Sequence, residues 1–92
     1  MNIPTALLGV LGQPKGAAHY VQRLINAKKL SANKAATMMG ISQSTLTRFL
    51  NGGALTPQMA ARLKNTFDLD VEFLFNLEAQ KLANKARECA LA

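Results

Sequence analysis

The stretch ANKAATMMGISQSTLTRFLN, residues 32–51, carries the strongest structural signal in this 92-residue chain. It predicts two short helices joined by a tight turn, because a serine precedes each of the two helical segments and a glycine lies between them. Ser31 and Ser42 are good N-caps, and Gly40 can adopt the positive φ that ends a helix abruptly. We expect the first helix to end just before this glycine and the second to run from Ser42 to Leu50.

The spacing of small and apolar residues within residues 32–51 matches what a helix-turn-helix requires. The fifth position, where the two helices touch, is small, and the ninth, at the turn, is glycine. Five further positions that should face the interior are apolar. In this order the seven residues are Ala36 and Gly40, then Ala35, Met39, Ile41, Leu46 and Phe49. Such a motif places its second helix in the major groove of DNA.

The second helix has an outer face suited to a major groove. Leu46, Phe49 and Leu50 form an inward stripe, which turns the other side chains outward. Glutamine pairs bidentately with adenine and arginine with guanine, while small hydroxyls permit close approach. The base contacts that we predict are Gln43, Ser44, Thr47 and Arg48. The DNA backbone contacts that we predict are Ser42, Lys34, Asn51, Gly52, Lys28 and Lys29. Backbone amides near Ser42 and in the turn at residues 51–53 are expected to bind phosphates.

Charge is distributed unevenly along the chain. The formal net charge is +6 and the isoelectric point is near 10.0. Residues 1–67 contain eight lysines and arginines and no carboxylate, whereas residues 68–92 contain five acidic residues and three basic ones. A polyanionic partner explains this pattern better than solubility does. We therefore expect double-stranded DNA as the partner and a different role for the C-terminal segment.

Helix signals on both sides of residues 32–51 predict an all-α domain of five helices, or six if residues 4–11 form a short helical turn. Thr56 before Pro57 is typical of a helix start, and Asp70 should cap a long last helix over residues 71–90. The inward faces are Tyr20, Val21, Leu24 and Ile25 in a helix over about residues 16–28, and Met59, Ala60, Leu63 and Phe67 in the helix that begins at Pro57. The length favours a single domain over residues 1–92.

The last helix is expected to mediate dimerisation. Apolar residues recur along one side of it, and it is long enough to project past so small a domain. The seam that we predict contains Val71, Leu74, Phe75 and Leu82. Packing within the monomer is the alternative for part of this stripe. A homodimer would place two recognition helices about 34 Å apart on a palindromic operator.

Residues 30–52, together with LTPQMAARL at residues 55–63, resemble the Cro/repressor-like helix-turn-helix superfamily. Within it, the HigA/VapI antitoxin family is the better match. The family's "(S/T)PEMA.RL" helix corresponds to the second of these segments, and its "EFWLNLQ" corresponds to EFLFNLE at residues 72–78. Two features differ from the family. Its "PHPGE" segment is replaced by QPKGA at residues 13–17, and its tryptophan is Leu74.

This resemblance, which covers roughly residues 18–80, implies a dimeric bacterial repressor that binds an operator in its own operon. It also implies a partner, a small ribonuclease toxin of RelE-like fold that the repressor neutralises. A helical protein-interaction module, acting as an antitoxin or anti-activator with little DNA binding of its own, is the alternative function. Membrane-surface binding is a weaker third option, because the basic residues are spread over several helices.

Catalysis has little support in the sequence. His19 is the only histidine, and no nucleophile stands with a base and an orienting acid. One histidine and the single cysteine, Cys89, are too few for a zinc site, so we expect no cofactor or metal. The lone cysteine and the lack of an export signal or membrane span favour the cytoplasm.

Overall fold

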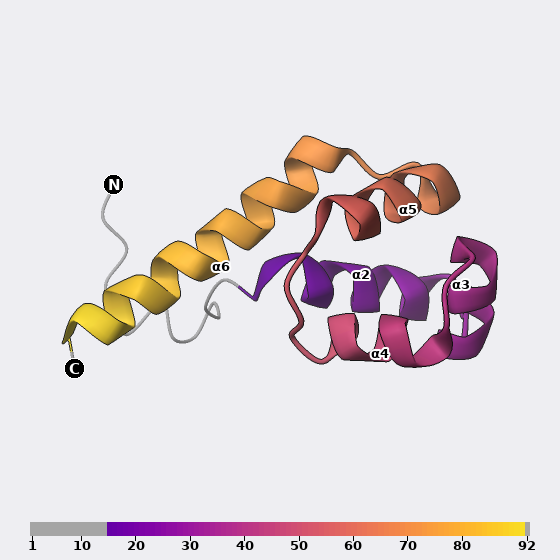
Figure 1. Ribbon diagram of the computed structural model, residues 1–92, viewed down its shortest axis with the longest axis horizontal. Coiled ribbons are helices and arrows are strands. Elements are labelled where there is room, and N and C mark those ends of the chain that lie inside the picture. The colour runs from indigo at the N-terminus through magenta and orange to yellow at the C-terminus, as the bar shows by residue number, and fades with distance from the viewer. Residues whose placement is uncertain (1–14, 92) are drawn as a thin grey trace.

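The computed structural model describes residues 15–91, and that part of the chain forms five α-helices without any strand (Figure 1). The helices are α2 (Gly16–Ala27), α3 (Ala32–Met39), α4 (Gln43–Leu50), α5 (Pro57–Phe67) and α6 (Val71–Leu91). The all-α class is thereby confirmed. The short helical turn expected over residues 4–11 lies outside the described residues. No helix among the described residues is long and apolar enough to cross a membrane.

The helix starts coincide with the capping residues predicted from the sequence. Ser31, Ser42 and Thr56 each accept a hydrogen bond from the amide three residues later, over 3.0, 3.1 and 3.1 Å. Asp70 caps α6 in the same way, over 3.2 Å to the amide of Phe73. Each bond satisfies an amide that has no acceptor inside its helix. These four caps explain why the boundaries could be predicted within one or two residues.

A single core lies among the five helices, and each contributes to it. Its largest fully buried side chains are Val21, Ile25, Leu46, Leu63 and Leu74. The predicted inward faces of α3, α4 and α5 are confirmed, because their apolar residues are buried or packed against this core. In Figure 1, α2 runs through the centre, with α4 below it, α5 above it and α3 beyond its C-terminal end.

The inward face of α2 differs from the prediction. Tyr20 lies at the surface, and Leu24 is only partly buried. Val21 and Ile25 are buried as expected, but the other core residues are Ala17 and Ala18. Small side chains at these two positions allow α6 to pack closely across the start of α2. The ring of Tyr20 instead packs edge-on against Phe73 of α6, with 5.0 Å between ring centroids.

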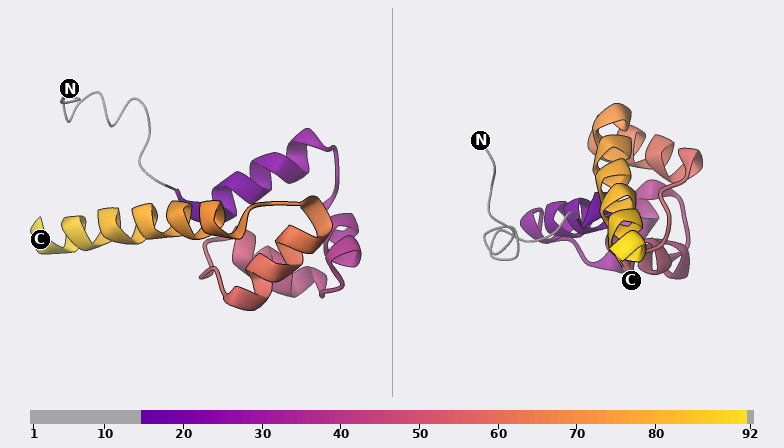
Figure 2. Two further views of the ribbon diagram at one scale, coloured as in Figure 1. Left: turned by 90° about the horizontal axis from the view of Figure 1, so that it is seen from above. Right: turned by 90° about the vertical axis from the view of Figure 1, so that its left-hand side faces the viewer.

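The α6 helix packs on the core only through its first half. Its second half projects away from the other helices (Figures 1 and 2). Leu74 is 0% exposed, so this residue of the predicted seam belongs to the protomer core and has no surface left for a second copy. Val71 and Phe75 are partly buried against the core, while Leu82 is 58% exposed. No residue after Glu78 is buried in the described part of α6.

Candidate nucleic-acid interface

The turn between α3 and α4 is fixed by contacts from within the motif and from α5. Gly40 has φ +73°, and the amide of Ile41 donates to the carbonyl of Ala36 over 3.0 Å. The guanidinium of Arg62, on α5, donates to the carbonyl of Met39 over 3.0 Å. This bond satisfies an acceptor at the end of α3 and ties α5 to the motif. From the sequence, Arg62 was expected to contribute only its positive charge.

The outer face of α4 collects the four side chains predicted to contact bases. Gln43, Ser44 and Arg48 are exposed, and Thr47 is partly buried. The guanidinium of Arg48 has one long hydrogen bond, from Nε to the carbonyl of Ser44 over 3.5 Å. Because the opposite face of α4 is buried in the core, these side chains are presented on a rigid support.

Among the predicted backbone contacts, one group differs from the expectation. The amides after α4 were expected to bind phosphate, but those of Asn51, Gly52 and Gly53 donate to carbonyls of α4 over 2.9 to 3.1 Å. The end of a helix leaves carbonyls without partners, and this turn satisfies them. Asn51 and Gly52 are nevertheless exposed, so the asparagine side chain remains the group that can contact a phosphate there.

The remaining predicted backbone contacts lie at the ends of helices. Lys34 is exposed in the first turn of α3, and Lys28 and Lys29 are exposed in the connection from α2 to α3. The hydroxyl of Ser42 caps α4 and lies 2.7 Å from the hydroxyl of Thr45. None of these side chains has an acidic neighbour in its own or the adjoining helix, since α2, α3 and α4 contain no Asp or Glu.

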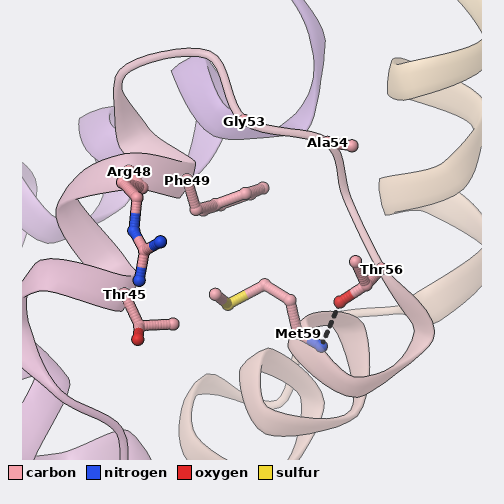
Figure 3. Close-up of a pocket in the computed structure, with 7 residues that line it drawn as sticks. All are labelled: Thr45, Arg48, Phe49, Gly53, Ala54, Thr56 and Met59. Atoms are coloured by element: carbon pink, nitrogen blue, oxygen red, sulfur yellow. Dashed lines mark hydrogen bonds between the residues drawn. The ribbon is translucent and has the colours of Figure 1, made fainter.

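A pocket of about 360 Å³ lies beside the outer face of α4, between this helix and the start of α5 (Figure 3). It is lined by Thr45, Arg48, Phe49, Gly53, Ala54, Thr56 and Met59. Arg48 belongs both to this pocket and to the outer face of α4. At Gly53 the chain passes so close to α4 that a Cβ atom would lie 2.8 Å from the carbonyl oxygen of Arg48. This pocket was not predicted from the sequence, because it combines residues of two helices and of the segment between them.

A buried carboxylate on α6 was also not predicted from the sequence. Glu78 is only 6% exposed and is the one charged residue buried among residues 15–91. Its Oε1 accepts from the amide of Ala17 over 3.3 Å, and its Oε2 accepts from the amide of Leu55 over 3.1 Å. The available signal was its position four residues after Leu74, on the same side of α6.

Comparison with known proteins agrees with this geometry. A family model described as helix-turn-helix matches residues 21–74, which is more than half of the chain and includes all of α3, α4 and α5. No curated protein and no solved structure matches the chain significantly. In the described part of the chain, no cluster of three His, Cys, Asp or Glu side chains could hold a metal ion.

Proposed function

Because this chain belongs to the helix-turn-helix family of the Cro/repressor-like superfamily, we propose that it represses transcription by binding an operator through the exposed face of α4. The family consists of DNA-binding transcription regulators. The observation that carries the proposal is the presentation of Gln43, Ser44 and Arg48 on one side of a helix whose other side is buried. These side chains offer hydrogen bonds to adenine and guanine edges in a major groove.

The first test is a selection of duplexes from a random-sequence library with the purified full chain. We expect a defined consensus whose affinity exceeds that of a scrambled duplex by at least about a thousandfold at physiological salt. Fluorescence anisotropy with the two duplexes measures this ratio. Equal affinity for both duplexes would contradict sequence-specific repression, and no binding to either would support the alternative function as a protein-interaction module.

We further propose that the repressor is a homodimer formed through the projecting half of α6. The support is an apolar stripe formed by Leu82, Ala86 and Cys89, spaced at four and three residues and exposed throughout. Such spacing is typical of helices that pair side by side. A two-fold axis at this seam would relate two copies of α4, so that the operator would be palindromic with half-sites about 34 Å apart.

Changing Leu82 to lysine tests the dimer. We expect the variant to sediment as a monomer, because the substitution places a charge in the apolar seam, and to lose most of its affinity for a two-half-site operator. The matched control is Gln80→Lys. Two residues rotate a helix by about 200°, so this control adds the same charge on the opposite side of α6. A dimeric Leu82→Lys variant would place the seam elsewhere.

We also propose that the chain is the antitoxin of a HigB/HigA-like pair in the bacterial cytoplasm. The support is the resemblance of residues 55–78 to that family, and the exposed aromatic pair of Tyr20 and Phe73 is a candidate contact for the toxin. The test is co-expression with a RelE-like ribonuclease encoded beside the gene. Restored growth would support the pairing, and continued growth arrest would leave a stand-alone repressor.

A further inference from the structure

The carboxylate of Glu78 connects three segments that are distant in sequence. It projects from α6 and binds the amide of Ala17 at the start of α2 and the amide of Leu55, just before α5. Ala17 and Leu55 are both buried, and so is Glu78 itself. The three segments therefore meet at one carboxylate in the interior.

Neither of these two amides has an acceptor within a helix. Ala17 lies in the first turn of α2, where amides have no intrahelical partner, and Leu55 precedes the N-cap of α5. A carboxylate is a stronger acceptor than a neutral oxygen, and its charge is favoured near a helix N-terminus. Glu78 therefore supplies acceptors that the chain lacks locally.

Space for this carboxylate depends on Gly16. This glycine has φ +81°, and a Cβ atom built on it would lie 2.7 Å from Oε1 of Glu78 and 2.6 Å from Cδ of Lys81. A larger residue would displace the carboxylate of Glu78 from the amide of Ala17 and would also be strained at this positive φ. The absence of a side chain at Gly16 is thus a requirement of the bond between Glu78 and Ala17.

The bond to Leu55 anchors the connection between α4 and α5, which we define as residues 51–56. This connection leaves the end of α4, passes against the carbonyl of Arg48 at Gly53, and forms one side of the pocket beside the outer face of α4 (Figure 3). Its exposed residues are Asn51, Gly52, Ala54 and Thr56. The hydrogen bond from Leu55 to Glu78 therefore fixes the path of the connection that borders the outer face of α4.

We propose that Glu78 is a positioning residue for DNA binding, which holds the connection between α4 and α5 in place through the amide of Leu55. This inference rests on the proposed function. Whether neutralising Glu78 raises or lowers the affinity for DNA distinguishes a positioning role from a purely electrostatic one. A carboxylate repels DNA, so its neutralisation would by charge alone raise the affinity, whereas loss of a positioning contact lowers it.

The test is Glu78→Gln, which keeps the size of the side chain but leaves one acceptor oxygen for two amides. We expect affinity for the selected operator to fall about tenfold. The slope of log affinity against log salt should stay unchanged, because no contact between a positive charge and a phosphate is removed. Lys34→Ala serves as the reference for a change in that slope. Affinity equal to or above that of the unmodified chain would overturn the inference.

Ile25→Val is the control for general loss of stability. It removes one methylene from the buried core without touching the connection between α4 and α5. We expect it to bind DNA like the unmodified chain at a temperature where both are folded. A loss of affinity equal to that of Glu78→Gln would contradict a positioning role for Glu78.

Amide hydrogen exchange of the unmodified chain is a test that needs no variant. Exchange at Leu55 as fast as at exposed Ala54 would also overturn the inference.

If the unmodified chain binds no DNA, the proposed function fails and the role of Glu78 in binding fails with it. If the unmodified chain binds its operator and Glu78→Gln binds equally well, only the inference on Glu78 fails. Slow exchange at the amide of Leu55, together with weaker binding by Glu78→Gln at constant salt slope, is the result that supports it.

Discussion

Replacing Arg48 by alanine is expected to weaken binding to the selected operator by about 5- to 150-fold, equivalent to about 1 to 3 kcal/mol. Arg48 is exposed on α4, and the one hydrogen bond recorded for its guanidinium is a long contact to the carbonyl of Ser44. Its side chain can therefore extend to a guanine without breaking a strong internal contact. The preference for guanine at one position of the operator should disappear, which a comparison of single-base variants by fluorescence anisotropy measures.

Lys34→Ala is the matched comparison for a phosphate contact. It should weaken operator and scrambled duplexes alike and reduce the salt slope by about 1. A combined alanine variant of Gln43, Ser44, Thr47 and Arg48 should retain only the affinity that the scrambled duplex shows. If that variant still distinguished the two duplexes, the recognition face would have to lie outside α4.

Leu74→Ala should lower the free energy of unfolding by about 2 to 5 kcal/mol, because it leaves a cavity in the core. Domains of this size are stable by only about 5 to 15 kcal/mol, so the melting temperature should fall by about 10 °C or more. Leu74 is completely buried within the protomer. The loss should therefore be the same at low and high protein concentration, as measured by chemical and thermal denaturation.

Leu82→Ala is the same substitution two turns further along α6, at an exposed position. We expect it to change the stability of the protomer by less than about 0.5 kcal/mol. Its effect should appear instead as a lower melting temperature at high protein concentration, and so as a weaker dependence of the melting temperature on concentration, because it weakens the dimer. If Leu74→Ala were harmless and Leu82→Ala strongly destabilising at every concentration, the packing of α6 described above would be wrong.

The sequence alone was sufficient for the helix-turn-helix, because its signals act over a few residues. Ser31 and Ser42 accept from amides three residues later, and Gly40 allows a backbone conformation that other residues avoid. The side chains on the outer face of α4 could be predicted because Leu46 and Phe49 mark its buried face, and helical periodicity then places the others outward. These inferences needed no knowledge of how distant segments pack.

Only the tertiary structure decided which side of α2 and α6 faces the core. Both helices have apolar residues around more than one side, so periodicity alone left Tyr20 and Leu74 open to either environment. The crossing of α6 over the small residues of α2 placed Leu74 in the core and Tyr20 at the surface. The same crossing left Leu82 exposed, which limits the proposed dimer seam to the second half of α6.

The tertiary structure also decided how polar groups are satisfied across the fold. Arg62 reaches Met39 over 23 residues of sequence, and Glu78 reaches Ala17 over 61. No local pattern specifies such partners, because each depends on where two distant segments meet after packing. Capping and helical periodicity thus determined the DNA-binding motif from its own residues. The contacts that hold its surroundings in place arise only when the whole chain has folded around one core.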